Sequence, residues 1–173
     1  MSGTTDTTFA PQGTMSRGML ATVLYRMAGS PEVIEPPSFQ DVSLHGWYSE
    51  GIAWAAQNDV MSGYGNDLFG PDDPITREQL AAVLWRYAGT EPNAQHIAFA
   101  DSETISSYAV EAVEWAAANG IITGRDGNLF APRDHATRAE TAVILYRYLN
   151  RQEEGGTPVP PENQDGAPEV FMT

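Results

Sequence analysis

The sequence has no cysteine and few basic residues. Without cysteine, the chain can form no disulfide, no thiolate metal site and no cysteine nucleophile. Its formal net charge is −14, from 23 acidic residues against 9 lysines and arginines. Such an acidic surface argues against nucleic acid and anionic membranes as partners, because both attract basic proteins. A local arginine cluster could still hold an anionic ligand.

Long apolar runs are absent as well. No stretch approaches the roughly 20 residues that a membrane-spanning helix needs. The first residues, MSGTTDTTF, lack the basic and apolar regions of a secretion signal, so an exported protein with this sequence would be a mature form or a fragment. The 173 residues, 42% of them hydrophobic, suffice for one globular domain or a short array of repeats.

The segment 69–89 carries concordant signals for a capped helix. Thr76 is a good N-cap residue, and Gln79, three residues on, can complete a capping box. Gly89 suits the left-handed conformation that ends many helices. Between them, apolar residues recur at helical spacing, at Leu80, Val83, Leu84 and Tyr87.

This segment occurs three times. Its first phenylalanine is Phe9, Phe69 or Phe130, at spacings of 60 and 61 residues. In each copy the cap position holds serine or threonine and is followed by arginine. These pairs are Ser16 and Arg17, Thr76 and Arg77, and Thr137 and Arg138. Three copies in one register indicate a repeat protein.

A second, shorter module precedes the second and third copies. It opens at Phe39 or Phe99, and an aspartate two residues later, Asp41 or Asp101, is placed for an Asx-turn. Each module then shows a short helical pattern that contains a tryptophan and ends in a glycine-containing turn. We expect outer helices over about 47–58 and 106–119, and longer capped helices over about 15–28, 74–88 and 135–150.

The pattern divides the chain into three units and a tail. We assign a partial first unit to residues 1–38, complete units to 39–98 and 99–150, and a flexible, acidic, Pro/Gly-rich tail to 151–173. Neither helix type can bury its apolar stripe alone. We therefore expect an all-α repeat array, with the three long helices in a central bundle around a pseudo-threefold axis and the shorter helices and loops outside it. The first unit lacks an outer helix and is incomplete.

The arginine after each cap has two interpretations. Its charge opposes the helix macrodipole, so its recurrence at Arg17, Arg77 and Arg138 suggests a function. A guanidinium beside the free N–H groups of a helix start suits a carboxylate ligand. Alternatively, the arginine forms an ion pair with a repeated acid such as Asp41 or Asp101.

Other recurring residues also have a structural and a functional interpretation. Trp47 and Tyr108 could stack on a sugar ring or pack the outer helices. Gly63 and Gly124 fit backbone turns, although a wall without side chains would also admit a ligand. Glu140 is first a capping group, as the two aspartates are first turn formers.

No pattern selects a metal site or a catalytic group. Asp126, Gly127 and Asn128 hint at a calcium loop, but the EF-hand spacing and its closing glutamate are missing. The three histidines do not recur in register and show no metal-ligand spacing. No motif selects a nucleophile or a pair of carboxylates. We therefore expect no metal, no cofactor and no enzymatic activity.

Together these motifs resemble the S-layer homology (SLH) family. Its repeat runs F-x-D, an aromatic residue, a helix rich in Ala and Trp, a glycine-containing turn, F-x-P, I-T-R-A-E and a helix ending in L-x-R. The likeness covers about residues 9–150 as three tandem repeats, and the first repeat matches only from Phe9 to Arg17. The matching positions of the other two are Phe39, Asp41, Trp47, Gly63, Phe69, Pro71, Ile75, Thr76 and Arg77, and then Phe99, Asp101, Tyr108, Gly120, Gly124, Phe130, Pro132, Thr137, Arg138 and Glu140.

The resemblance implies a function and a location. SLH modules hold exported proteins on the bacterial cell surface without covalent bonds, by binding a secondary cell-wall polysaccharide, often pyruvylated, in grooves between repeats. The family's motif arginine points to Arg77 and Arg138, and more weakly to Arg17, as ligand contacts. The full set of predicted ligand-binding residues is Arg77, Arg138, Arg17, Glu140, Asp41, Asp101, Trp47, Tyr108, Gly63 and Gly124.

The sequence departs from the family motif in two of its three repeats. Only the third has T-R-A-E intact, because Gln79 replaces the glutamate in the second and Met19 replaces it in the first. We therefore expect one or two competent grooves. Three alternatives stay open: a protein–protein assembly module on the same scaffold, a fragment of a larger surface protein, and self-association.

Overall fold

A computed structural model describes residues 10–91 and 98–153 and confirms the all-α fold class. The expected loose residues 1–8 and most of the expected tail, 154–173, lie outside the described residues. Residues 151–153, assigned to the tail from the sequence, instead continue the last helix. The helices are α1 (Arg17–Met27), α2 (Ser49–Gln57), α3 (Arg77–Ala88), α4 (Val110–Ala118) and α5 (Arg138–Glu153), with a short 3₁₀ turn at Ser102–Thr104.

The predicted N-caps are confirmed. The Ser16 hydroxyl accepts the backbone N–H of Met19 at 3.2 Å. Thr76 and Gln79 form the predicted capping box, in which each side chain accepts the other residue's backbone N–H. The third unit has the same reciprocal pair, Thr137 with Glu140. Local chemistry therefore sets the start of all three long helices.

These helices begin two or three residues later than the sequence indicated, and the reason is tertiary. The residues before each cap are extended and bind one another. The N–H of Met15 donates to the carbonyl of Ala136 at 2.8 Å, that of Ile75 to Met15 at 2.8 Å, and that of Ala136 to Ile75 at 2.9 Å. We call this closed triangle the backbone ring. It places the three units around a pseudo-threefold axis, as expected.

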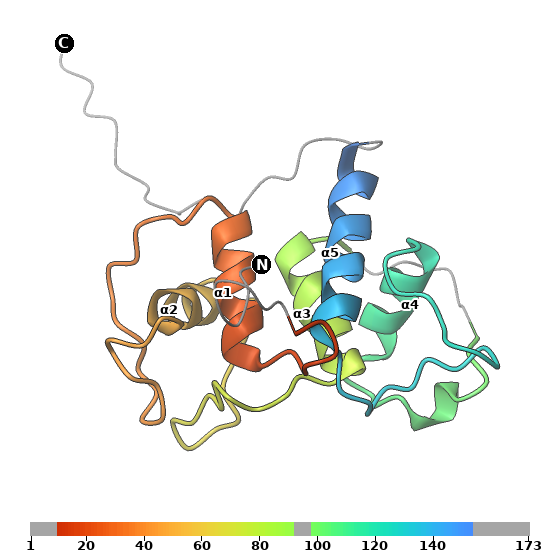
Figure 1. Ribbon diagram of the computed structural model, residues 1–173, viewed down its shortest axis with the longest axis horizontal. Coiled ribbons are helices and arrows are strands. Elements are labelled where there is room, and N and C mark those ends of the chain that lie inside the picture. Colours follow the sequence, from red (N-terminus) through yellow and green to blue (C-terminus); the bar gives the residue numbers. More distant parts are fainter. Residues whose placement is uncertain (1–9, 92–97, 154–173) are drawn as a thin grey trace, which may run out of the picture.

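The outer helices pack on the long helix of the preceding unit. Helix α2 lies against α1, and α4 lies against α3. A Cβ built on Gly51 of α2 would lie 2.7 Å from the Cα of Thr22, so only glycine permits this close approach. In Figure 1, α2 and α4 flank the group formed by α1, α3 and α5 on opposite sides.

Aromatic side chains of the outer helices contact those of the long helices. Trp54 of α2 contacts Tyr25 of α1 and Tyr87 of α3, with ring centroids 6.0 and 6.1 Å apart. Trp115 of α4 contacts Tyr148 of α5 at 6.5 Å. Each outer helix is therefore a wedge between two long helices. Both are shorter than predicted, because the residues before Ser49 and Val110 form turns.

Candidate binding grooves

Two of the three recurring arginines are anchored by backbone carbonyls from the following unit. Arg17 is 6% exposed and donates from Nε to the Phe69 carbonyl at 2.9 Å and from Nη2 to Ser62 at 2.7 Å. Arg77 is 3% exposed and repeats the arrangement with Phe130 at 2.8 Å and Thr123 at 3.2 Å. Burial lowers the pKa of both guanidinium groups. Both stay cationic at neutral pH, because arginine starts so far above it.

Aromatic faces complete the seats of these arginines. The Arg17 guanidinium carbon lies 4.4 Å from the ring centre of Tyr64 and 4.7 Å from that of Phe69. That of Arg77 lies 5.3 Å from the ring centre of Phe130. A cation over an aromatic face is attracted by the ring quadrupole. The aromatic rings and the backbone carbonyls therefore both stabilise the charged form of the guanidinium group.

Each of these arginines contributes to the lining of a surface groove. The first groove has a volume of about 160 Å³ and the second about 320 Å³. Nine positions of the two grooves correspond at spacings of 60 or 61 residues. The first groove is lined by Arg17, Met61, Ser62, Gly63, Tyr64, Gln79, Ala82, Val83, Arg86 and Tyr108. The second is lined by Arg77, Ile122, Thr123, Gly124, Arg125, Ala139, Glu140, Val143, Ile144 and Arg147.

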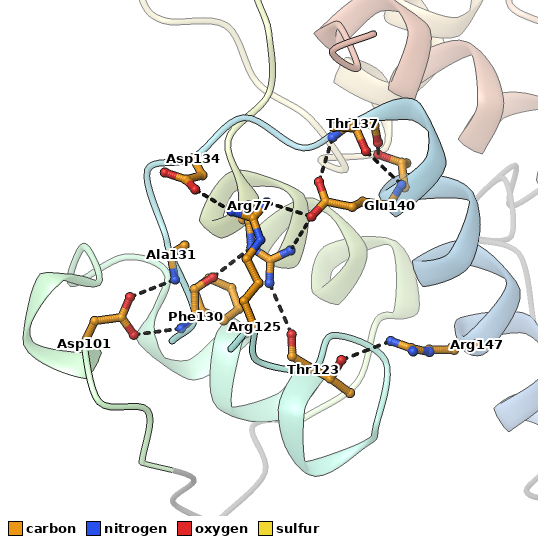
Figure 2. A network of polar contacts seen from close by, with 11 residues as sticks. Arg77, Asp101, Thr123, Arg125, Phe130, Ala131, Asp134, Thr137, Glu140 and Arg147 are labelled. Atoms are coloured by element: carbon orange, nitrogen blue, oxygen red, sulfur yellow. Dashed lines mark hydrogen bonds and ion pairs between the residues drawn. The ribbon is translucent and has the colours of Figure 1, made fainter. Parts of the chain in front are cut away.

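The two grooves differ in how their charges are paired. In the second groove, Glu140 lies 3.4 Å from Nη1 of Arg77 and 2.7 Å from Nη2 of Arg125. Arg125 also pairs with Asp134 (Figure 2). Burial alone would raise the pKa of Glu140, but the Thr137 N–H and the two arginines lower it overall. This groove therefore holds its own carboxylate.

The first groove has no carboxylate in its lining. Gln79 and Tyr64 stand where the second groove has Glu140 and Arg125. Burial raises the pKa of Tyr64, so its phenol stays neutral at pH 7. The first groove thus presents a buried cation, Arg17, and an exposed one, Arg86, with neutral polar groups between them.

The exposed arginines at the groove rims were not among the predicted site residues. Arg86 and Arg147 occupy equivalent positions in α3 and α5. Arg147 donates to the Thr123 hydroxyl at 3.3 Å (Figure 2). The two arginines recur 61 residues apart in the sequence, but an arginine near the expected C-terminus of a helix is explained by the free carbonyls and the dipole there, so the recurrence alone does not indicate a binding site. Tyr64 and Arg125 were also not predicted. They occupy equivalent positions of two repeats but differ in residue type, so no recurrence marks them.

Arg138 takes a third, related position. It is 6% exposed, its N–H donates to the Gly13 carbonyl at 2.8 Å, and its Nη1 lies 3.4 Å from the sulfur of Met19. It lies in the lining of neither groove. The segment equivalent to the turns at Ser62 and Thr123 falls before Ala10, outside the described residues.

The prediction that Asp41 and Asp101 form local Asx-turns was wrong. The Asp41 carboxylate accepts the N–H groups of Phe69 and Gly70 at 2.8 and 2.7 Å, 28 and 29 residues away. The Asp101 carboxylate accepts the equivalent pair of N–H groups, from Phe130 and Ala131, at 2.7 and 2.8 Å (Figure 2). The long-range N–H groups win because the turn before each long helix leaves two of them without a local acceptor. The alternative interpretation, a direct ion pair between these aspartates and the arginines, is not what the structure shows, since Arg17 and Arg77 donate to carbonyls and the aspartates act on them only at longer range.

Three of the four predicted glycine and aromatic positions line a groove, and one does not. Gly63 and Gly124 line the two grooves, and a Cβ on Gly63 would lie 2.4 Å from the Leu68 carbonyl oxygen. Tyr108 lines the first groove, with its hydroxyl 3.5 Å from a Glu78 oxygen. Trp47 is 60% exposed and lines neither groove.

Residues 10–91 and 98–153 contain neither a candidate membrane span nor a candidate metal site. No helix in this part of the chain is both long and apolar enough to cross a membrane. No group of three or more histidine, aspartate or glutamate side chains in it is arranged to hold a metal ion.

Comparison with known proteins gives consistent matches. A family model described as the S-layer homology domain matches residues 38–81 and 98–142. An amylopullulanase of Thermoanaerobacterium thermosulfurigenes is 33% identical over 154 residues, 86% of this chain and 8% of that protein. A surface-layer 125 kDa protein of Lysinibacillus sphaericus is 30% identical over 94% of this chain and 13% of its own length. A cellulosome-anchoring protein of Acetivibrio thermocellus is 25% identical over 83% of this chain and 34% of its own length. The chain thus spans at most about a third of these relatives.

Proposed function

Because the chain belongs to the S-layer homology domain family, we propose that it holds a protein on the bacterial cell wall by binding a secondary cell-wall polysaccharide non-covalently in its two grooves. A role in cell-surface anchoring is supported by relatives that are named as surface-layer and cellulosome-anchoring proteins. The polysaccharide and the contacts are the proposal. Its main support is the recurrence of one groove, with a buried arginine and a rim arginine, in two successive units.

The groove chemistry suits a sugar that carries a carboxylate, such as a pyruvylated one. Carbonyls and aromatic rings fix Arg17 and Arg77, so little side-chain entropy is lost when an anion binds. Arg86 and Arg147 would supply a second charge-assisted contact from the rim. In the first groove, Tyr64 and Tyr108 add rings on which a sugar face can stack.

We propose that the first groove is the stronger site for an acidic sugar. Its two arginines face no carboxylate in the lining. In the second groove, Glu140 already forms ion pairs with Arg77 and Arg125, and an anionic ligand would have to displace it or lie beside it. Breaking such charge-assisted pairs costs free energy, which the new contacts of the ligand would have to offset.

We propose no catalytic role for this chain. Some relatives are named as enzymes, such as the amylopullulanase, but the chain corresponds to 8% of that protein. The family match accounts for both complete repeats. The catalytic activity of those proteins is therefore not carried over.

Binding to cell-wall sacculi tests the proposal. The chain is mixed with purified sacculi, with and without their secondary polysaccharide, and the bound fraction is measured. Arg86→Ala is the most informative variant, because this arginine is exposed and we expect its removal to leave the fold intact. We expect about a tenfold loss of affinity, the equivalent of one charge-assisted contact. Arg133→Ala removes the same charge from an exposed loop outside both grooves and is the matched control.

The outcome separates the two functional classes. Binding that needs both the polysaccharide and Arg86 supports a carbohydrate anchor. Equal binding with and without the polysaccharide, or equal loss in the Arg133 control, contradicts it. Either result would favour the second candidate, a protein–protein assembly module, for which the exposed apolar face of α5 is the specific observation.

A further inference from the structure

The buried carboxylate of Glu78 takes no part in the helix caps and lines neither groove. The residue lies in the first turn of α3 and is 6% exposed. Its Oε2 accepts the Ser106 N–H at 2.9 Å, and its Oε1 accepts the Ser106 hydroxyl at 2.8 Å. The Tyr108 hydroxyl lies 3.5 Å from Oε1. Glu78 thus binds the segment of the third unit that leads to Tyr108, a residue of the first groove.

The turn that carries Tyr108 is held at both ends. At its start, Ser106 is bound to Glu78. At its end, the Ala109 N–H donates to the Ser106 carbonyl at 2.8 Å, and Ala109 is fully buried. The Ala109 carbonyl then accepts the Val113 N–H at 2.8 Å, where α4 begins. Tyr108 is half-exposed between these points, so its side chain reaches the groove from a fixed backbone that Glu78 joins to α3.

The equivalent junction between the first two units is filled without a carboxylate. Gly18 of α1 corresponds to Glu78, and Tyr48 corresponds to Ala109. A Cβ on Gly18 would lie 2.9 Å from the Pro71 carbonyl oxygen and 3.4 Å from the Cβ of Tyr48. A glycine and a tyrosine thus fill one junction, and a glutamate and an alanine fill the other. Because burying a carboxylate costs free energy that a largely apolar ring avoids, the glutamate points to a task other than filling space.

The carboxylate decides the direction of the hydrogen bond at Tyr108. An ionised carboxylate only accepts hydrogen bonds, whereas a phenol donates one and accepts others. Burial and the charge of Glu78 raise the pKa of Tyr108, so the phenol keeps its proton at neutral pH. With this proton directed at Glu78, the lone pairs of the Tyr108 oxygen are left for a ligand. The groove therefore offers donors at Arg17 and Arg86 and an acceptor at Tyr108.

We propose that Glu78 is a positioning residue of the first groove, which holds Tyr108 so that its oxygen accepts a hydrogen bond from a sugar hydroxyl. The first groove then recognises two groups of one acidic sugar, its carboxylate at the arginines and a free hydroxyl at Tyr108. This inference rests on the proposed function and adds the hydroxyl to it. The second groove has no aromatic residue in its lining, so it should not recognise a hydroxyl in this way.

Amide hydrogen exchange tests the positioning without any ligand. In the full chain, the exchange of the Ser106 N–H is followed by NMR. We expect Glu78→Ala to speed this exchange about tenfold or more, because the N–H loses its carboxylate acceptor. Glu103→Ala removes an exposed carboxylate from the 3₁₀ turn just before Ser106 and is the matched control. An unchanged rate in Glu78→Ala, or an equal rise in the control, overturns the positioning role.

Sugar recognition is measured separately for each groove. The probe is a methyl hexoside that carries a pyruvate ketal, compared with the same compound after methylation of its remaining hydroxyls. The amide chemical shifts of Gly63 report binding in the first groove, and those of Gly124 report binding in the second. At Gly63 we expect the parent chain to bind the hydroxylated probe about tenfold more tightly, and we expect Glu78→Ala and Tyr108→Phe to lose this preference. At Gly124 neither variant should change the affinity.

Tyr108→Phe keeps the test decisive if Glu78→Ala is unstable, because it removes only a hydroxyl from a half-exposed ring. A hydroxyl preference at Gly63 that survives Tyr108→Phe overturns the inference and leaves the proposed function standing. An equal loss of affinity at Gly63 and Gly124 in Glu78→Ala overturns it as well, because Glu78 would then serve only the stability of the fold. Binding of neither probe in either groove contradicts the proposed function, and the inference with it.

Discussion

Gln79 and Glu140 occupy the same capping position, but only Glu140 also reaches the arginine of the neighbouring unit. Both side chains accept the N–H of their own N-cap residue, Thr76 or Thr137. They differ in their other contacts. Glu140 also forms ion pairs with Arg77 and Arg125, whereas Gln79 lies in a groove whose lining contains no carboxylate. The residue type at this repeated position thus decides whether the groove lining contains a carboxylate.

Exchanging this pair should exchange the preference of the grooves. Glu140→Gln keeps the capping acceptor and removes the ion pair of Arg77 and one of the two ion pairs of Arg125, so we expect the second groove to bind acidic sugar fragments more tightly. Gln79→Glu should weaken the first groove by about tenfold. Calorimetric titration with pyruvylated and neutral fragments measures both. Unchanged affinities in both variants would show that these grooves do not bind the acidic group.

The buried arginines should matter for stability before they matter for binding. Arg77→Ala removes two hydrogen bonds from a charged donor to the carbonyls of Phe130 and Thr123. At 1.5–3 kcal/mol for a hydrogen bond to a charged group, we expect a loss of roughly 3 kcal/mol in the free energy of unfolding. Urea unfolding measures it, and a loss below about 1 kcal/mol would contradict the structural role. The exposed Arg147→Ala is the control.

Acid should destabilise the fold through Asp41 and Glu140. Burial would raise the pKa of Asp41 above its ordinary 3.8, but the N–H groups of Phe69 and Gly70 lower it overall. The pKa of Glu140 is lowered as well. A lowered pKa stabilises the folded state above the ordinary value and loses this contribution as the pH falls through the folded-state value.

The free energy of unfolding should therefore be flat near neutral pH and fall below about pH 4. Asp41→Asn should be less stable at pH 7 and should lose less stability on acidification. Denaturant unfolding at several pH values between 7 and 2.5 gives both slopes. Parallel curves for the variant and the parent would exclude Asp41 as a source of the pH dependence.

The two groove glycines should differ in their tolerance of a methyl group. A Cβ on Gly63 would lie 2.4 Å from the Leu68 carbonyl oxygen and 2.7 Å from the Phe39 ring. On Gly124 the nearest atom, in the Phe99 ring, is 3.1 Å away. We expect Gly63→Ala to cost about 3 kcal/mol and Gly124→Ala about 1 kcal/mol. Their thermal unfolding midpoints provide the comparison, and equal shifts would refute the packing argument.

Sequence patterns predicted the parts of this molecule that depend on neighbours in the chain. The caps at Ser16, Thr76 and Thr137 need residues only three positions away, and the helical stripes need one or two turns. The 60-residue period then placed these elements in equivalent units. The helix starts were misplaced at Met15 and its equivalents because backbone pairing between units replaced the first helical turn.

The groove contacts could not be read in the same way. Arg17 and Arg77 bind carbonyl oxygens, which every residue has, so no residue type in the sequence identifies the acceptor. Asp41 likewise binds N–H groups 28 and 29 residues away. Trp47 was predicted from its recurrence with Tyr108, yet only Tyr108 lines one of the two grooves.

The backbone ring has a mechanical consequence. The bond from Met15 to Ala136 joins residues 121 positions apart and ties the first unit to the last. An open array of repeats can unfold from its ends one unit at a time. A closed array has no terminal unit from which such unfolding could start. A pull that separates the first unit from the third must load this bond together with the bonds at Ile75, so the three units should yield in a single event rather than in three steps.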